Sequence, residues 1–258
     1  MFARSFAAAG VLSLSLSLSA CGSAPETGLD HLSRVARVTS VVQDRARHLR
    51  ATARLCLPPD YAGQQEAVAA IDAAFEPALM LTDVRASLAA GYPFQANREL
   101  LAELATPQNQ AVFDLQLAAL RAAPERLPEF RLDALSPERV AAVESYVRAM
   151  QTGERTRAYI ETACPGIGGA LRRLAYPVEQ RARAVCEQQM QTRPESLVRV
   201  AAYQLSGLGD AQLRDLVAMV ETPAFSAHLS ALEAANLAAA RAGIERLARG
   251  VQHLDATR

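Results

Sequence analysis

One run of residues has the composition of a phosphate-binding loop. Residues 166–169 read Gly-Ile-Gly-Gly, and Arg172 and Arg173 follow them. At a helix N-terminus such a run could hold a phosphate through backbone N–H groups and guanidinium groups. The known phosphate and dinucleotide loops follow a β-strand, however, and the Walker pattern requires a lysine, which this chain lacks. We therefore do not expect a phosphate site here.

No other set of residues matches a catalytic pattern. The chain has no Gly-x-Ser-x-Gly elbow and no His-Glu-x-x-His motif, and no serine or cysteine stands beside an obvious base. Its histidines are scattered, at His31, His48, His228 and His253. No pair of Cys or His residues has the close spacing of metal ligands. We therefore predict a protein that is not an enzyme and that binds neither a metal nor a cofactor.

The first twenty residues have the layout of a secretory signal. Arg4 is their one charged side chain, and residues 5–20 are rich in Ala, Leu and Ser. This apolar part is too short to cross a bilayer of ~30 Å comfortably as a permanent helix. Residues 1–20 are therefore left out of the predicted fold.

Leu18-Ser19-Ala20-Cys21 closes that segment and resembles the lipobox of bacterial lipoproteins. The resemblance implies that the Cys21 thiol receives a diacylglycerol, that residues 1–20 are removed, and that the new amino terminus is acylated, for example with palmitate. Two or three acyl chains anchor a protein firmly, because each buried methylene contributes ~0.8 kcal/mol. A plain signal peptide with a coincidental cysteine is the alternative.

The residue after the cysteine bears on the location within the envelope. Gly22 stands where an Asp often retains enterobacterial lipoproteins in the inner membrane. Its identity favours the inner leaflet of the outer membrane, with the protein facing the periplasm. On this interpretation residues 21–28 form a tether, and residues 29–258 form a helical domain.

Lipidation of Cys21 would leave three cysteines in an oxidising compartment. One disulfide and one free thiol are the natural partition, and three pairings are possible. We favour Cys164 with Cys186, because Pro165 and the glycines that follow it can turn the chain so that two helices lie antiparallel. Cys56 would then remain a free thiol.

The charge balance excludes one class of partner. The chain has 27 basic residues, all arginine, and 27 acidic residues, so it lacks the basic surface that nucleic-acid binding requires. Arg47, Arg50 and Arg54 recur at i, i+3 and i+7 and could contact lipid headgroups or another anionic surface near the anchor. A solvated helix face is the alternative. A second arginine cluster comprises Arg172, Arg173, Arg181 and Arg183.

The sequence after the tether has helical periodicity throughout. Apolar stripes occur at Val35, Val38, Val42 and Leu49, at Val140, Val143, Val147 and Met150, at Leu213, Leu216, Val217 and Val220, and at Ile244, Leu247, Val251 and Leu254. No window alternates as a strand does. We predict an all-α fold, an irregular multi-helix bundle of about eight to ten helices.

Several residues mark helix boundaries. Helix starts are predicted where a hydroxyl residue precedes proline, at Thr106-Pro107, Ser136-Pro137 and Thr222-Pro223. Gly207 and Gly209 predict a stop and a restart. Pro77 and Pro177 are expected to break or kink their segments.

Two windows separated by 116 residues suggest an internal repeat. Residues 98–114 match residues 214–230 at six positions, including the Thr-Pro pair of each window. A duplication would divide the domain into related halves, 29–133 and 134–258. The alternative is that two unrelated helices begin with the same Thr-Pro cap.

Residues 208–224 carry a second resemblance. They read Leu-Gly-Asp-Ala-Gln-Leu-Arg-Asp-Leu-Val-Ala-Met-Val-Glu-Thr-Pro-Ala. This run is similar to the C-terminal signature of a family of all-helical envelope proteins known only as a domain of unknown function. Met219 stands where that family usually has Phe, and Ala224-Phe225 stands near its Gly. The resemblance implies a helical fold and an envelope location, and it lends no activity.

Two functions fit these observations. The first is a non-catalytic, membrane-anchored lipoprotein that binds another envelope component or assists envelope assembly, since Ala, Leu and Val surfaces suit close helix packing. The second is a binder of a small apolar or anionic ligand in a cavity between helices. The expected lining of that cavity is Phe75, Leu79, Met80, Phe94, Phe113 and Phe130.

Overall fold

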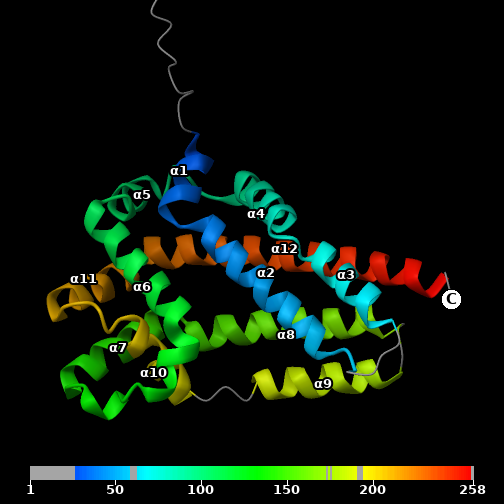
Figure 1. Ribbon diagram of the computed structural model, residues 1–258. Coiled ribbons are helices and arrows are strands. Elements are labelled where there is room, and N and C mark those ends of the chain that lie inside the picture. Colours follow the sequence, from blue (N-terminus) through cyan, green and yellow to red (C-terminus); the bar gives the residue numbers. More distant parts are fainter. Residues whose placement is uncertain (1–26, 59–62, 173, 175, 191–193, 257–258) are drawn as a thin grey trace, which may run out of the picture.

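The computed structural model describes residues 27–58, 63–172, 174, 176–190 and 194–256. Within these ranges the chain is helical and forms no strand, so the predicted all-α multi-helix fold is confirmed (Figure 1). The described chain contains twelve α-helices, more than expected, because short helices such as α1 and α5 leave no separate periodic signal. Cys21 and most of the predicted tether lie outside the described residues.

The elements follow one another with short connections. In chain order they are α1 (Gly28–Val35), α2 (Val38–Leu55), α3 (Gln64–Ala74), α4 (Pro77–Gly91), α5 (Arg98–Leu104), α6 (Pro107–Arg126), the 3-10 turns η1 (Leu127–Glu129) and η2 (Leu132–Ala134), α7 (Pro137–Ala149), α8 (Thr152–Leu171), α9 (Tyr176–Met190), α10 (Pro194–Gln204), α11 (Asp210–Val220) and α12 (Pro223–Ala256).

The three hydroxyl-proline pairs begin helices, as predicted. The side-chain oxygens of Thr106, Ser136 and Thr222 accept hydrogen bonds from backbone N–H groups three residues ahead, at 3.4, 3.2 and 3.2 Å. Each bond satisfies an N–H group that has no partner within the first helical turn. The proline that follows already has a helical φ, so it starts the helix without losing a bond.

The long helix α12 is the axis on which other elements pack. It has 34 residues, about 51 Å at 1.5 Å per residue, and it contacts α3, α4 and α8 (Figure 1). Helix α2 packs against α4, α3, α9 and α8, and α9 packs against α8. Helices α6, α7, α10 and α11 gather at one end of the molecule, where α7 contacts both α10 and α11.

One core runs through the described chain. Its fully buried side chains come from both predicted halves, for example Ile71 and Phe75 from the first and Leu205 and Leu247 from the second. Several alanines are also fully buried, which allows the helix axes to approach closely. Residues 29–133 and 134–258 therefore build their core together.

The two repeat windows have the same junction geometry. Thr106 Oγ1 donates to Glu103 O at 2.8 Å, and Thr222 Oγ1 donates to Met219 O at 2.8 Å. In both windows a short helix ends and a Thr-Pro pair starts the next one. A Thr-Pro cap produces this geometry by itself. The shared geometry therefore fits a duplication, and it equally fits two unrelated helices that begin with the same cap.

The prolines and glycines agree with the predictions in part. Helix α3 ends at Ala74 and Pro77 opens α4, so the chain breaks there as predicted. Pro177 is the second residue of α9, a position where a helix tolerates proline, and it does not kink that helix. Gly207 and Gly209 separate α10 from α11, as predicted. Helix α8 continues through Pro165 and residues 166–169, so the expected turn there is wrong and the chain reverses after Leu171.

Candidate ligand pocket

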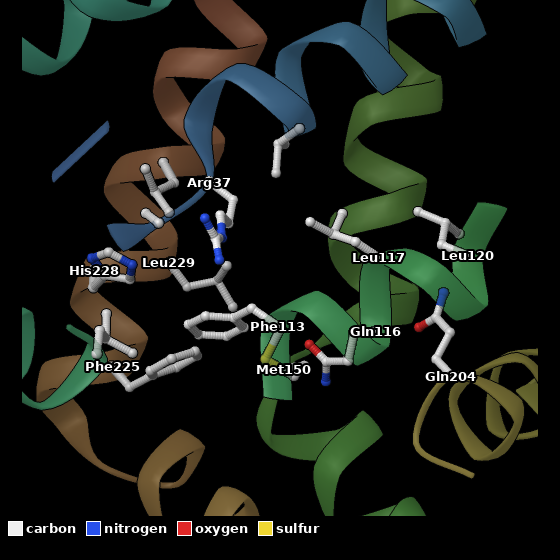
Figure 2. A pocket seen from close by; sticks show the side chains of 14 residues that line it. Arg37, Phe113, Gln116, Leu117, Leu120, Met150, Gln204, Phe225, His228 and Leu229 are labelled. Carbon is white, nitrogen blue, oxygen red and sulfur yellow. The ribbon is translucent and has the colours of Figure 1, made fainter. Parts of the chain in front are cut away.

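A pocket of about 260 Å³ lies between α2, α6 and α12 (Figure 2). Its walls are mostly apolar: Val41 comes from α2, Leu117 and Leu120 from α6, and Leu229 and Leu232 from α12. Met150 after α7 and Gln204 at the end of α10 also line it. A mostly apolar cavity with a few polar groups is the usual form of a small-molecule site.

The residues that were expected to line a cavity are mostly elsewhere. Phe113 alone of the six lines this pocket. Phe75 and Met80 are buried in the core, and Leu79 is exposed. The ring of Phe94 stacks at a tilt on Tyr92, and that of Phe130 meets Tyr203 edge to face. The lining prediction is therefore wrong for five residues, because large apolar side chains fill a helical core before they surround a cavity.

Helix α6 is held over the pocket by a polar side chain. Gln110 Nε2 donates to Leu104 O at 2.8 Å and to Val35 O, the end of α1, at 3.0 Å. Of the α6 residues with described side chains, Val112 is the buried apolar one, and the other apolar side chains are half-buried or exposed. The helix therefore closes one side of the pocket without being embedded in the core.

Arg37 brings a positive charge to the pocket. It stands between α1 and α2 with φ 52°, in the left-handed region that residues other than glycine rarely adopt. Its guanidinium points toward the pocket (Figure 2). Nη2 donates to Asp114 Oδ1 at 2.7 Å, whereas Nε is buried and has no hydrogen-bond partner among the described residues. Backbone strain of this kind is concentrated at functional sites.

His228 supplies a second polar group. Its Nδ1 lies 2.6 Å from the Tyr92 hydroxyl, and the two share a hydrogen bond. Burial lowers the pKa of His228 to about 4, and burial raises the pKa of Tyr92 to about 12. Both side chains are therefore neutral near pH 7. Arg37 is the one charged residue in the lining.

The lining carries no group that would start covalent chemistry. No serine, cysteine or carboxylate is among the residues that line the pocket. The neutral His228 is already bonded to Tyr92 through one nitrogen. The pocket is therefore suited to holding a ligand, with an apolar body against the leucines and a polar group near Arg37.

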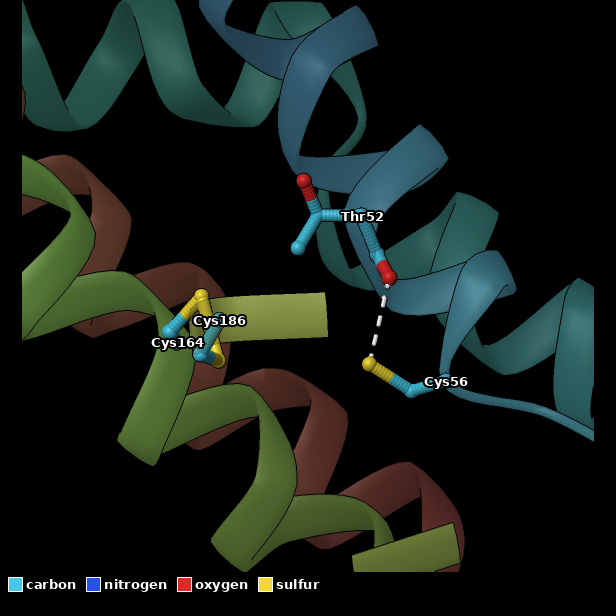
Figure 3. Close-up of a disulfide and its surroundings, with 4 residues drawn as sticks. All are labelled: Thr52, Cys56, Cys164 and Cys186. Carbon is cyan, nitrogen blue, oxygen red and sulfur yellow. Dashed lines mark hydrogen bonds between the residues drawn. A yellow bond between two sulfur atoms is a disulfide. The ribbon is translucent and has the colours of Figure 1, made fainter. Parts of the chain in front are cut away.

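The cysteines form the pair that the sequence favoured. Cys164 in α8 and Cys186 in α9 are joined by a disulfide, with their Cα atoms 5.6 Å apart (Figure 3). Cys56 is a buried free thiol whose Sγ donates to Thr52 O at 3.2 Å. Burial raises the pKa of Cys56 to about 11, so it is protonated and unreactive near pH 7.

The arginine stripe on α2 is partly neutralised by carboxylates. Arg47 pairs with Asp44 at 3.0 Å, and Arg54 Nη2 donates to both oxygens of Asp72 at 2.5 and 2.6 Å. Arg50 is half-buried. The structure therefore leaves less free positive charge on this face than the sequence spacing indicated.

The glycine run is not a phosphate loop. Residues 166–169 lie inside α8 near its C-terminal end. Backbone N–H groups there are used by the helix, and the helix dipole at that end disfavours an anion. Arg172 and Arg183 border a separate hollow beside the disulfide, and Arg173 lies outside the described residues.

The other histidines do not gather. His31 lies 3.0 Å from Arg34 through its Nδ1, and His48 sits near the Tyr159 ring. The side chain of His253 is outside the described part of the chain. Within that part, no three His, Cys, Asp or Glu side chains come together as metal ligands.

Among the described helices, none combines the length and the apolar character that a membrane span requires. Residues 208–224, which carry the family resemblance, form α11 and the start of α12. No family model, curated protein or solved structure matches this chain.

Proposed function

We propose that this chain is a lipid-anchored protein of the bacterial cell envelope whose helical domain binds a small, mostly apolar ligand without transforming it. The observation that carries the binding function is the apolar pocket between α2, α6 and α12, with Arg37 and His228 at its wall. The anchor rests on the lipobox-like residues that end at Cys21. Helix α1 begins at Gly28, which leaves only a short tether after that cysteine.

The anchor is tested by acylation and fractionation. Cells that express the chain are grown with labelled palmitate, and their membranes are separated from the periplasm. We expect label and protein in the outer membrane fraction, and Cys21→Ser should lose both the label and the outer membrane location. Cys56→Ser is the matched control and should remain labelled. Absence of label on the parent protein would overturn the proposed lipid anchor at Cys21.

The pocket is tested with small amphiphiles on the full chain carrying Cys21→Ser. We expect 1-octanol or octanoate to bind in calorimetric titrations, and Leu117→Trp to abolish binding because the larger side chain fills the cavity. Leu115→Trp, on the exposed side of the same helix, is the control and should bind normally. Absence of binding by both compounds would overturn the ligand function.

A second candidate is the binding of another envelope protein, which would also suit an assembly role. It is favoured by two exposed leucines on α6, Leu115 and Leu120, which are 42% and 41% exposed. Cross-linking in native membranes should then capture a partner that is lost with Leu115→Glu and with Cys21→Ser. An unchanged cross-linking pattern in Leu115→Glu would exclude α6 as the contact.

A further inference from the structure

The guanidinium of Arg37 is only partly used. A guanidinium has five N–H donors in a fixed planar fork. One of these donors bonds Asp114, and the buried Nε–H has no acceptor in the described chain. A buried donor without an acceptor is unfavourable, so a ligand carboxylate that displaced Asp114 and reached Nε would gain a bond that the protein alone does not make.

The present partner of Arg37 is weakly held. The Asp114 side chain is 64% exposed, whereas that of Arg37 is 30% exposed. Solvent weakens the attraction between such partly exposed charges. Asp114 is not among the residues that line the pocket, so within the lining the Arg37 guanidinium has no carboxylate beside it.

We propose that the ligand is a monocarboxylate with an apolar body. Its carboxylate accepts hydrogen bonds side-on from Nε and Nη2 of Arg37 and takes the place of Asp114. Its apolar part lies against Leu117, Leu120 and Leu232. This inference rests on the proposed ligand function, because it names the chemical class that the same pocket takes.

Octanoate and octanamide separate charge from shape, since they have the same number of non-hydrogen atoms. On the full chain carrying Cys21→Ser, we expect octanoate to bind at least tenfold more tightly than octanamide at pH 7.5 and low salt. Added NaCl should weaken the binding of octanoate and leave the binding of octanamide unchanged.

Two variants should change the affinity for octanoate relative to octanamide in opposite directions. Arg37→Gln should remove the advantage of octanoate, whereas Asp114→Asn should increase it severalfold because a competing carboxylate is gone. Arg121→Gln, an exposed arginine on α6, is the control and should change neither affinity. If Arg37→Gln fails to fold, Asp114→Asn still tests the proposal.

The outcomes distinguish the two proposals. Equal affinities for octanoate and octanamide, both abolished by Leu117→Trp, would overturn the carboxylate proposal and keep the ligand function. An unchanged octanoate-to-octanamide ratio in Asp114→Asn would also overturn the proposed exchange at Arg37. No binding of octanoate, octanamide or 1-octanol would overturn both proposals.

Discussion

The neutral state of His228 makes stability depend on pH. In the folded protein burial lowers its pKa from 6.5 to about 4. The unfolded chain therefore takes up the proton at a higher pH than the folded chain does. This contribution is fully present above about pH 6.5 and is lost as the pH falls toward 4, by about 3 kcal/mol in total.

Denaturant unfolding at pH 7.5, 6.5, 5.5 and 4.5 measures this loss. The pKa of His48 is also lowered, mainly by burial and further by the Arg45 charge, so it contributes in the same direction. His228→Asn isolates the His228 part, because asparagine does not titrate. Its unfolding free energy should fall less steeply over this range than that of the parent. Identical slopes would contradict the assignment.

Thiol counting tests the chemical states of the cysteines. Cys56 is 1% exposed and its pKa is about 11, so a maleimide should not label it in the folded protein near pH 7. With Cys21→Ser, denaturation should expose one reactive thiol, and reduction should raise the number to three. Two or more thiols before reduction would contradict the Cys164–Cys186 disulfide.

At the scale of elements, one glycine sets how closely α12 approaches α3. A Cβ atom on Gly243 would lie 2.7 Å from Cδ1 and Cε1 of Phe75, a fully buried ring after α3. Overpacking a core costs ~1–3 kcal/mol, which exceeds the gain of ~1 kcal/mol from replacing a helical glycine with alanine. We therefore expect Gly243→Ala to destabilise the protein by about 1 kcal/mol.

The matched control for this substitution is Gly169→Ala in α8. A Cβ at Gly169 meets nothing within 4 Å, so helix propensity alone applies and we expect a gain of ~0.5–1 kcal/mol. Thermal unfolding of both variants measures the difference. A stabilised Gly243→Ala protein would show that α12 is not pressed against Phe75.

The sequence predicted the elements better than their contacts. Local chemistry sufficed at Thr106, Ser136 and Thr222, because a cap and its helix lie within four residues. The turn predicted at Pro165 is wrong, because α8 continues through this proline. Local signals therefore fix where many helices begin, but not every place where the chain turns.

The pocket could not be predicted from the sequence for a different reason. It is assembled from α2, α6 and α12, which are far apart along the chain. Arg37 has a left-handed backbone conformation, which sequence reasoning usually predicts only at glycine. Its partner Asp114 lies 77 residues away in the chain. The sequence predicts Phe113 as a lining residue, but its residue type does not distinguish it from Phe75, which is buried in the core.

At the scale of the whole molecule, the disulfide secures α9 to the rest of the fold. It spans 22 residues between Cys164 and Cys186, and α9 also packs against α2 and α8. The loop-entropy relation gives a stabilisation of about 3 kcal/mol for such a span. We therefore expect the double variant Cys164→Ala, Cys186→Ala to lose about that amount in denaturant unfolding. Reduction of the parent should match this loss, and an unchanged midpoint in both would exclude a structural role.

The position of α12 in the chain bears on when the protein can fold. Helices α3, α4 and α8 all rest on α12, the last element of the described chain. During synthesis from the N-terminus this surface is absent until residues 223–256 have been made, and contacts between distant segments form slowly. The contacts of α3, α4 and α8 with α12 therefore form after the contacts that α2 makes with α3 and α4 have become available.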